Sequence, residues 1–339
     1  MKSVYTKNLV YQGKVNLSPD HIVVVCSADN NYAMPLAVTV RSALENLNHN
    51  CKILLFIIDG GIKKNNKQKI LKSLSCDKCE VEFLPVPQSL IKEIEESHND
   101  LIQNEDRNRT RRINHISIAS YYRLVIPELL PHWIEKVIYL DCDLVVNGDL
   151  KQLWKMDLKE NYVLAAQDVS ICYVSAPNGL LNHEELGISP ESKYFNAGVL
   201  TINLKKWRDD KITTKAVEYF QQNKEFVRWH DQDVLNAVLA GQWGELHPKW
   251  NFQPMIDAYS SWEASPFSEE VYNDLMYTPY IIHYVTRLKP WNFYYTPYKE
   301  YFFQYVDKTL WSGWRLTFWK RVWITARREF QKTIYRVRK

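Results

Sequence analysis

The chain has 339 residues, of which 46% are hydrophobic and 24% are charged, and its formal net charge is +4. This length and apolar content allow a substantial core, in one large or two moderate domains, and exclude a disordered or fibrous protein. Apolar strand patterns alternate with helical patterns along the chain, which predicts an α/β fold.

Cysteine usage and the first residues bear on the compartment. The six cysteines are spread singly apart from Cys76 and Cys79. This lone pair lacks the second pair that a zinc site needs, so we expect free thiols in a reducing cytoplasm. The first residues contain no apolar core of a signal peptide, and no uncharged apolar stretch approaches the ~20 residues that a transmembrane helix requires. We therefore expect a cytoplasmic protein.

The first predicted strand begins at Ile22 and breaks into a polar turn that contains Asp29, Asn31 and Tyr32, before a helix predicted over 34–47. A turn at the carboxyl end of a strand is where open α/β sheets bind ligands. The same aspartate and asparagine types are also good caps for the following helix. Both interpretations stay open here.

An amphipathic stretch at 115–123 follows a basic run at 107–112 and ends in Arg123. The planar guanidinium fork of arginine suits sugar diols and phosphate oxygens. Taken alone, an arginine at this position is more typical of a surface ion pair. The residues alone assign no role to His115, at the start of the stretch.

Two aspartates, Asp141 and Asp143, follow the apolar run 137–140, which predicts a buried strand. In an extended chain, side chains at i and i+2 point to the same side, so both carboxylates can reach one ion. Hard oxygen ligands of this kind suit Mg²⁺ or Mn²⁺. The spacing alone is weakly specific, because Asp231 and Asp233 repeat it at a predicted helix start. The apolar flanks favour the first pair, since a buried charge without a partner is costly.

Two further apolar strands carry polar groups that can face a ligand. The segment 163–167 runs into Asp168, and the segment 194–203 contains Asn196 and Gly198. A glycine inside a strand allows close approach of another group to the backbone. Asn196 by itself is equally consistent with a turn residue.

The last polar motifs lie between residues 230 and 291. We expect Asp231 to cap a helix, and Asp233 to cap or brace the same turn. His283 follows an apolar strand, where a histidine is more often a hydrogen-bonded core residue than a metal ligand. Lys289 follows in a Lys-Pro-Trp sequence.

In their order, these segments resemble glycosyltransferase family 8, the retaining GT-A enzymes that include bacterial lipopolysaccharide galactosyl- and glucosyltransferases and, more distantly, glycogenin. The matching segments are 22–32, 115–123, 139–143, 163–168, 194–203, 230–236 and 281–291. The ordered series is more specific than any single motif.

The resemblance implies a fold and a division of the chain. The fold is GT-A, a Rossmann-like mixed central sheet flanked by helices, followed by a basic, aromatic, helical tail. The implied parts are an N-terminal extension (1–20), a GT-A domain (21–300) with a nucleotide-binding half (21–150) and an acceptor half (151–300), and the tail (301–339).

The resemblance also implies roles for individual residues. Contacts to a UDP-sugar are implied for Asp29, Asn31, Tyr32, His115, Ile116, Arg123, Asp141, Cys142, Asp168, Asn196 and Lys289. His283 would join Asp141 and Asp143 as a ligand of Mn²⁺ or Mg²⁺. Gln232 would lie at the anomeric carbon, as a nucleophile or as a dipole that stabilises the cation, with Asp231 as the alternative carboxylate. One departure is Thr286, where the family usually has glycine, and its side chain can narrow the diphosphate pocket.

The implied reaction moves glucose or galactose from UDP-glucose or UDP-galactose to a saccharide or glycolipid acceptor of the lipopolysaccharide type, forming an α-linkage. Lys289 and the metal would stabilise the departing diphosphate. One hydroxyl orientation separates the two sugars, and the sequence does not choose between them.

Two other functions stay open on the sequence. The segment 139–146 also looks like the first motif of haloacid dehalogenase-type phosphatases, although that motif usually lies close to the start of the chain. A non-catalytic protein that binds a nucleotide-sugar is the second alternative, and Thr286 is its sole support.

The tail differs from the rest in charge. Residues 311–339 contain nine basic residues and one acidic residue, so residues 1–310 are net negative. Trp311, Trp314 and Trp319 can share one face of a predicted amphipathic helix, with basic residues largely on the other. This combination suits an anionic membrane surface, so we expect peripheral association with the inner face of the membrane. A helix packed on the core is the plainer alternative, and a net negative body argues against nucleic acid as a partner.

Overall fold

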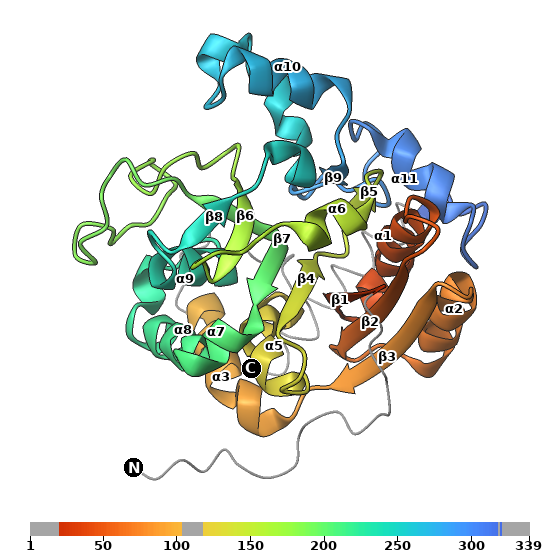
Figure 1. Cartoon of the computed structure of the whole chain (residues 1–339), viewed down its shortest axis with the longest axis horizontal. Coiled ribbons are helices and arrows are strands. Elements are labelled where there is room, and N and C mark those ends of the chain that lie inside the picture. The colour runs from red at the N-terminus through yellow and green to blue at the C-terminus, as the bar shows by residue number, and fades with distance from the viewer. Residues whose placement is uncertain (1–19, 104–117, 318, 321–339) are drawn as a thin grey trace.

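The computed structural model describes residues 20–103, 118–317, 319 and 320, and within them a mixed sheet lies between layers of helices (Figure 1). This is the predicted α/β architecture. The strands, in chain order, are β1 (His21–Ala28), β2 (Lys52–Asp59), β3 (Cys79–Pro85), β4 (Lys136–Leu140), β5 (Leu144–Val146), β6 (Val163–Gln167), β7 (Phe195–Asn203), β8 (Trp243–Glu245) and β9 (Ile281–His283).

Helices connect most of these strands. The α-helices are α1 (Ala33–Glu45), α2 (Lys64–Leu74), α3 (Gln88–Gln103), α5 (Ile126–Leu129), α6 (Leu150–Lys155), α7 (Leu204–Asp209), α8 (Ile212–Gln222), α9 (Asp231–Val238), α10 (Glu269–Tyr277) and α11 (Lys299–Val306). Short 3₁₀ helices are η1 (Asn30–Tyr32), η2 (Ile118–Val125), η3 (Lys224–Phe226), η4 (Pro248–Asn251), η5 (Pro254–Ala258) and η6 (Trp262–Ala264).

The main sheet has seven strands in the order β3-β2-β1-β4-β7-β6-β8. Strands β3, β2, β1 and β4 are mutually parallel, and β7 runs antiparallel to both of its neighbours, β4 and β6. The strand order reverses between β1 and β4, because β2 and β3 lie on one side of β1 and β4 lies on the other. Open α/β sheets bind ligands at the carboxyl ends of the strands beside such a reversal.

The strands of this sheet are apolar along their length because both faces are buried, as in other helix-covered parallel sheets. In β1, Val23 and Val25 point into a core shared with α3, η2 and helices α7 to α9. Ile22, Val24 and Cys26 point into a second core, shared with α1, α2 and α6. This alternation follows from the two-residue period of a strand.

The polar residues that follow these strands meet at one edge of the sheet. β1 and β4 are parallel, so Asp29 and Asp141 come directly after their carboxyl ends on the same edge. β7 runs the other way, so its beginning, with Asn196, lies at this edge too. β6 is antiparallel to β7 and ends at Gln167, which brings Asp168 to the same place.

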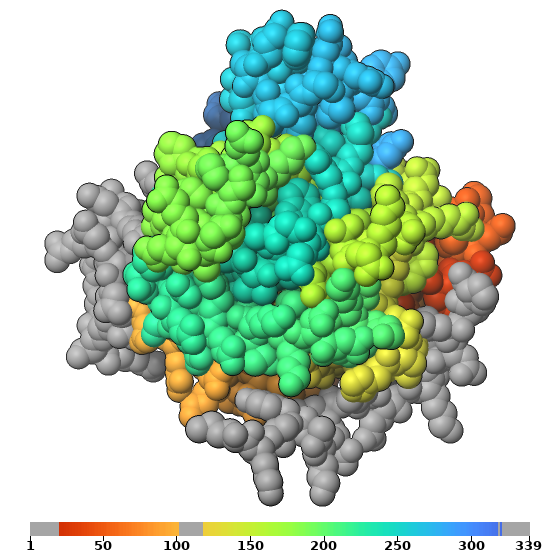
Figure 2. All heavy atoms as spheres, turned by 60° about the vertical axis from the view of Figure 1, so that its left-hand side comes forward, coloured from red at the N-terminus to blue at the C-terminus, as the bar shows by residue number. Residues whose placement is uncertain are grey.

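A second, two-stranded sheet carries the histidine motif to this edge. β5 and β9 pair antiparallel, with Leu144 opposite His283, so the histidine lies beside Asp143. The backbone N–H of His283 donates to the carbonyl of Phe252 at 2.8 Å, which places the end of η4 alongside β9. A third apolar core joins β5 and β9 to α1, α10 and α11. The region around α10 projects from the body as a separate lobe at the top of Figure 2.

The predicted amphipathic helix from Trp311 is wrong for residues 311–317, whereas residues 319 and 320 are helical. Residues 311–317 form turns and irregular chain. Trp311 and Trp314 are half-buried because they pack on the body: the Lys69 ammonium lies 5.3 Å from the Trp311 ring, and Trp314 stacks on Phe303 with 6.5 Å between ring centroids. The remainder, 321–339, lies outside the described residues. Of the helices in the described ranges, none has the length and apolarity that a bilayer crossing requires.

Candidate active site

A cavity of about 740 Å³ opens at the edge of the sheet where β1, β4 and β6 end and β7 begins. Most of the predicted site residues line it. They are Asp29, Tyr32, Arg123, Asp141, Cys142, Asp143, Asp168, Asn196, Asp231, Gln232, His283 and Lys289. Asn31 is exposed instead, and its amide donates to Asp29 at 3.4 Å. His115 and Ile116 lie outside the described residues.

The two oxygens of the Asp141 carboxylate have different neighbours. Its Oδ1 accepts hydrogen bonds from Arg123 Nη2 at 2.8 Å and from the Tyr139 hydroxyl at 2.9 Å. Its Oδ2 faces the ring of His283, 3.9 Å from Nε2. Arginine and tyrosine therefore hold the side chain so that one oxygen points into the cavity.

The carboxylate of Asp143 is divided in the same way. Its Oδ2 accepts from the Lys289 ammonium, which also donates to the carbonyl of Tyr284. Its Oδ1 lies 3.3 Å from His283 Nε2. Burial alone would raise the pKa of Asp143, but the neighbouring Lys289 ammonium outweighs burial and holds the pKa well below its usual range. Asp143 is therefore ionised at any physiological pH.

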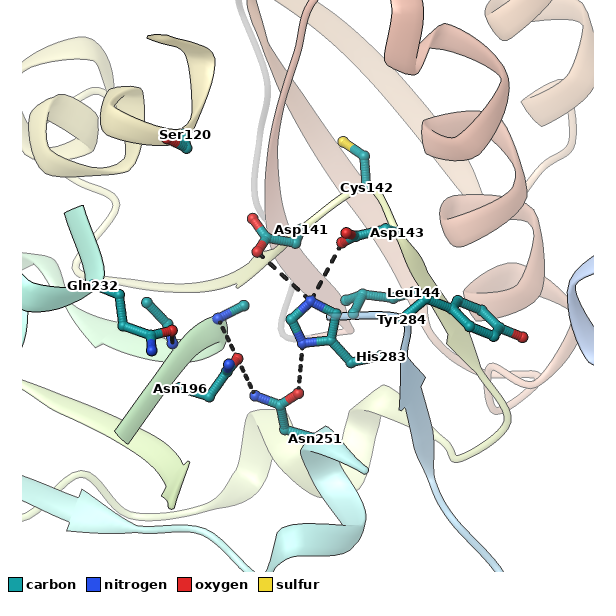
Figure 3. Close-up of polar contacts among 12 residues, drawn as sticks. Ser120, Asp141, Cys142, Asp143, Leu144, Asn196, Gln232, Asn251, His283 and Tyr284 are labelled. Carbon is teal, nitrogen blue, oxygen red and sulfur yellow. Dashed lines mark hydrogen bonds and ion pairs between the residues drawn. The ribbon is translucent and has the colours of Figure 1, made fainter. Parts of the chain in front are cut away.

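The free oxygens of both aspartates converge on the same nitrogen of His283 (Figure 3). One ligand atom from each of the three residues lies within 4.8 Å of the other two, which is the arrangement of a possible metal site. Two carboxylate oxygens and an imidazole nitrogen suit Mn²⁺ and Mg²⁺ by ligand type. The donor set thus fits the cation that the motifs implied.

Gly198 allows the histidine to take this position. An ideal Cβ on residue 198 would lie 2.2 Å from Cε1 and 2.7 Å from Nδ1 of the His283 ring. The close approach that the sequence predicted at this glycine is therefore an approach by the His283 ring. The backbone carbonyl of Gly198 also accepts from the Asp141 N–H at 2.8 Å, which continues the β4–β7 ladder into the site.

The prediction that Asp231 caps α9 is wrong. The N-cap residue is His230, which makes no side-chain cap, and Asp231 is the first residue of the helix. Its Oδ2 instead forms a buried ion pair with Arg123, at 2.7 Å from Nε. Sequence reasoning missed this contact because η2 and α9 lie more than 100 residues apart. Burial raises the pKa of Asp231 to about 6, against the opposing charge of Arg123.

Arg123 joins the two halves of the cavity wall. It is 4% exposed, and its guanidinium reaches Asp141, Asp231 and the carbonyl of Ala197. A surface ion pair, the plainer interpretation of this residue, is therefore excluded. Although burial lowers the pKa of an arginine, the two aspartates keep the pKa of Arg123 above its ordinary value.

Gln232 is held in place by both ends of its amide. Its Oε1 accepts the N–H of Ala197 at 3.0 Å, and its Nε2 donates to Asp168 Oδ2 at 3.3 Å. Asp233, one residue further, points away from the cavity and braces the turn before α9. It accepts from the N–H groups of Arg228 and Trp229 and from the Tyr194 hydroxyl, at 2.6, 2.7 and 2.7 Å.

The turn after β1 combines the two interpretations that the sequence left open. Asp29 caps η1, because its Oδ1 accepts the N–H groups of Asn31 and Tyr32 at 2.8 and 3.1 Å. Asp29 and Tyr32 also line the cavity. The Tyr32 ring meets Trp291 edge to face, with 5.8 Å between centroids. Asp29 therefore caps η1 at the point where the cavity begins, whereas α1, the helix expected to be capped, starts after Tyr32 without a side-chain cap.

The loop between His283 and Lys289 forms one rim of the cavity. Thr286 and Arg287 both line it. The Thr286 hydroxyl accepts the N–H of Leu288 at 3.1 Å, so this side chain closes the loop on itself. Arg287 is exposed.

Several residues of this site were not singled out by the motif analysis. Tyr139 was noticed only as the start of the Asp141 motif, although its hydroxyl holds that carboxylate. Asn251 lies at the end of η4 and bonds to His283, and Gln253 lies nearby on the cavity wall. A lone asparagine after a tryptophan has no periodicity or spacing that marks it, so sequence reasoning had no signal for Asn251.

Comparison with other proteins places the chain among glycosyltransferases. The sequence model of the family described as Glycosyl transferase family 8 matches residues 23–294 of this chain. General stress protein A of Bacillus subtilis (strain 168) is 32% identical over 296 residues, which cover 85% of this chain and 94% of that protein. Lipopolysaccharide 1,2-glucosyltransferase of Escherichia coli (strain K12) is 32% identical over 177 residues, covering 52% of this chain and 50% of that protein.

A solved structure of a glycosyltransferase has a similar fold. The galactosyltransferase LgtC, in complex with donor and acceptor sugar analogues, superposes with a TM-score of 0.69 at 28% identity, covering 85% of this chain and 96% of that one. This similarity, together with the mixed seven-stranded sheet, confirms the predicted GT-A fold.

Proposed function

The chain belongs to glycosyl transferase family 8, and from this premise we propose that it is a retaining enzyme that moves glucose or galactose from a UDP-sugar to a hydroxyl of a saccharide or glycolipid acceptor. A glycosyltransferase needs a donor site in which a sugar is held beside a stabilised leaving group. The observation that carries the proposal is the convergence of the free oxygens of Asp141 and Asp143 on Nε2 of His283, inside a cavity that also contains Lys289.

We propose that Asp141, Asp143 and His283 hold Mn²⁺ or Mg²⁺. Each aspartate has one oxygen engaged by a protein cation and one oxygen free, so the carboxylates are oriented before the ion binds. Because the carboxylates are already oriented, ion binding requires less rearrangement of these side chains. When bound, a divalent cation at these ligands supplies electrophilic stabilisation of a diphosphate leaving group.

The nucleotide is proposed to lie along the first half of the domain, against Asp29, Tyr32 and Cys142. An aromatic ring provides a surface for a base, and the acceptor groups of Asp29 suit ribose hydroxyls. Lys289, from the other side of the cavity, is proposed to neutralise the departing phosphate. Its ammonium already forms an ion pair with Asp143, so Lys289 would lie close to both the phosphate and the metal ion. Asn31, His115 and Ile116 are also proposed to contact the UDP-sugar.

The transferred hexose is proposed to lie between Asp168, Asn196 and Gln232. Asp168 and Asn196 are both buried, and Asn196 donates to Asp168 Oδ2 at 2.8 Å, so the pair presents a polar wall to sugar hydroxyls. We propose that Gln232 stabilises the positive charge at the anomeric carbon, because an amide is a poor nucleophile and its Oε1 is a fixed dipole. Asp231 is the alternative carboxylate, and its ion pair with Arg123 supports a positioning role instead.

The acceptor is proposed to be a lipopolysaccharide-type glycolipid, bound by the second half of the domain. The relative from Escherichia coli carries the name of a lipopolysaccharide glucosyltransferase, and this supports the acceptor class. We further propose that residues 311–339 attach the cytoplasmic enzyme to the anionic inner face of the membrane. Their nine basic residues and the 76% exposed Trp319 support this attachment.

The two alternative functions fare differently. A haloacid dehalogenase-like phosphatase is set aside, because the family match extends over residues 23–294 and the aspartate pair belongs to a GT-A fold. A non-catalytic protein is disfavoured by the similarity to named glycosyltransferases, and the experiment below tests it directly.

The experiment is a screen of UDP-glucose, UDP-galactose and related donors for Mn²⁺-dependent release of UDP, with Asp143→Asn as the test variant. We expect activity with a UDP-hexose and a loss of at least about 100-fold in the variant, because one charged ligand is removed. Asp210→Asn is the matched control, since the Asp210 carboxylate accepts from the Tyr162 hydroxyl at 2.8 Å and lies away from the cavity. Full turnover by Asp143→Asn, or no release of UDP from any donor, would contradict the proposal.

A further inference from the structure

One chain of hydrogen bonds runs from the metal site to the sugar site, and Figure 3 shows its part from His283 through Asn251 to Asn196. His283 Nδ1 lies 2.8 Å from Asn251 Oδ1, and Asn251 Nδ2 donates to Asn196 Oδ1 at 2.8 Å. Asn196 Nδ2 then donates to Asp168 Oδ2 at 2.8 Å. The four residues come from β9, η4, β7 and the end of β6, and all four are buried. Asn251 is the link between the two sites, and no motif contains it.

The donor and the acceptor of each hydrogen bond can be assigned by starting from the carboxylate of Asp168. A carboxylate accepts hydrogen bonds and a backbone N–H donates them. The group of Asn196 that faces Asp168 must therefore be the NH₂ group. The N–H of Gly198 donates to the other side of the same amide at 3.0 Å, so that side must be the oxygen. The orientation of Asn196 is thus required by two independent neighbours.

The same argument determines the orientation of the Asn251 amide and then which nitrogen of His283 carries a proton. The group of Asn251 that faces Asn196 Oδ1 must be a donor, so it is the NH₂ group. The remaining oxygen of Asn251 faces His283 Nδ1 and must receive a proton from it. His283 therefore carries a proton on Nδ1, which leaves Nε2, on the side of Asp141 and Asp143, as the nitrogen through which a metal ion can bind. A neutral imidazole of this tautomer is the form that binds a metal ion through Nε2.

We infer that Asn251 is a positioning residue that sets the tautomer of His283 for metal binding and ties the metal site to the sugar-binding pair Asp168 and Asn196. This inference rests on the proposed metal-dependent transfer from a UDP-sugar. Partners that orient a metal-binding histidine typically change metal affinity by about 10–100-fold when they are removed. Without Asn251, His283 would be free to rotate or to carry its proton on Nε2, which blocks the lone pair.

The first test is made on the unaltered, metal-free protein. Nuclear magnetic resonance of ¹⁵N-labelled histidine reports which ring nitrogen carries the proton, and the signal of His283 is identified by its absence in His283→Gln. We expect a proton on Nδ1 in the unaltered protein. A His283 whose Nδ1 carries no proton overturns the inference, whatever the enzyme's activity. This readout does not depend on any variant that fails to fold.

The second test compares Asn251→Ala with the unaltered protein by titration with Mn²⁺ alone, with free Mn²⁺ followed by electron paramagnetic resonance. We expect Mn²⁺ to bind about 10–100-fold more weakly to the variant, and excess Mn²⁺ to restore part of its rate of UDP release. Asn182→Ala is the matched control. Asn182 is also a buried asparagine, but its amide bonds to Asn223 and Tyr219, away from the cavity.

The outcomes separate this inference from the proposed function. Equal Mn²⁺ affinity in Asn251→Ala and the unaltered protein overturns the role of Asn251, even if UDP-sugars are good donors. Weakened Mn²⁺ binding in Asn182→Ala to the same extent also overturns it, because the effect would then be general loss of stability. Absence of UDP release from every donor, with the expected tautomer and Mn²⁺ affinities, would contradict the proposed reaction alone.

Discussion

Gly198 and His283 are in such close contact that residue 198 has no room for a side chain. A Cβ at this position would lie 2.2 Å from Cε1 of the imidazole and 3.0 Å from Asp141 Oδ2. Contacts shorter than 3.0 Å essentially do not occur, so the ring would have to leave its place. A glycine in the middle of a buried strand, which otherwise weakens the strand, is thus required by the site.

We therefore predict that Gly198→Ala disrupts the metal site more than the fold. Displacement of the His283 ring removes one of the three proposed ligands, so Mn²⁺ affinity and UDP release should both fall by at least about tenfold. Overpacking should lower the free energy of unfolding by about 1–3 kcal/mol. Mn²⁺ titration and urea unfolding measure the two effects.

Gly244→Ala provides the control for overpacking. A Cβ on Gly244, in β8, would lie 2.5 Å from Leu164 Cδ2 and 2.8 Å from Asn161 Nδ2, both at the ends of side chains that can turn aside. This variant should therefore lose less stability than Gly198→Ala and bind Mn²⁺ normally. Normal Mn²⁺ binding by Gly198→Ala as well would show that the ring can move aside without consequence.

The sequence predicted the parts of this site that depend on local patterns. Apolar runs that end in a polar residue located β1, β4 and β6, and the parallel direction of the first two brought Asp29 and Asp141 to the same edge. Such runs are readable because a strand buried on both faces needs apolar side chains throughout. The helix predicted over 34–47 likewise corresponds to α1, Ala33–Glu45.

Most of the contacts that were missed join different elements of the chain. Asp231 was expected to cap a helix, and the structure pairs it with Arg123 from η2. Trp311 and Trp314 were expected on a free amphipathic face, but Lys69 and Phe303 cover them. Single-residue types and periodicity describe only the residue's own element, so neither contact had a local signal.

Arg123 provides a second prediction. It is 4% exposed and bridges Asp141 and Asp231, so Arg123→Ala should lower the free energy of unfolding by about 3–5 kcal/mol, because the buried carboxylate of Asp231 and the half-buried one of Asp141 lose their cation. Arg123→Lys should recover part of this loss, since a single ammonium cannot span both carboxylates. Urea unfolding measures both variants.

The control for this pair is Arg315, whose ion pair with Asp307 is exposed. Arg315 and Asp307 meet at 2.7 Å, but their side chains are 44% and 43% exposed. Water and salt screen such a pair, so Arg315→Ala should change stability by less than about 1 kcal/mol. A comparable loss in both alanine variants would show that burial does not strengthen the Arg123 contacts.

A third prediction concerns the pH dependence of stability. Burial raises the pKa of Asp233 from its ordinary 3.8 to about 6 in the folded protein. The folded state therefore holds this proton more tightly than the unfolded state, so the group stabilises the fold as the pH falls from about 6 to about 4. Above pH 6, ionisation of buried Asp233 lowers the free energy of unfolding by about 3 kcal/mol.

Asp233→Asn should remove this dependence. The amide oxygen can still accept from the N–H groups of Arg228 and Trp229, and the Tyr194 hydroxyl can turn to accept from the NH₂ group. The free energy of unfolding of the variant, relative to the unaltered protein, should therefore rise between pH 4 and pH 7. Urea unfolding at several pH values tests this, and two parallel curves would contradict the raised pKa.

A fourth prediction addresses the rim of the cavity. Arg287 is exposed beside Thr286, whose hydroxyl bond to the Leu288 N–H holds the loop. We predict that Arg287 attracts the diphosphate of the donor, so Arg287→Ala should raise the KM for the UDP-sugar about two- to fivefold with little change in kcat. The effect should shrink at high salt, because exposed charges are screened. Arg287→Lys keeps the charge and should behave almost normally, and an unchanged KM in the alanine variant would exclude the contact.

A fifth prediction concerns the boundary between body and tail. Trp311 and Trp314 pack against Lys69 and Phe303, so removal of everything after Leu310 would uncover apolar surface of the body. A cut after Lys320 keeps these contacts and still removes seven of the nine basic residues of 311–339. We therefore expect the protein cut after Lys320 to remain stable and to release UDP normally with a soluble acceptor.

The same truncated protein should lose its attachment to membranes. Each basic residue near an anionic surface contributes about 1 kcal/mol, so loss of seven removes most of the electrostatic attraction. Sedimentation with vesicles that contain an anionic lipid should deplete the full chain but not the truncated one, and vesicles of neutral lipid should deplete neither. If the truncated protein still sediments with anionic vesicles, the attachment lies in residues 1–320, and residues 321–339 have another role.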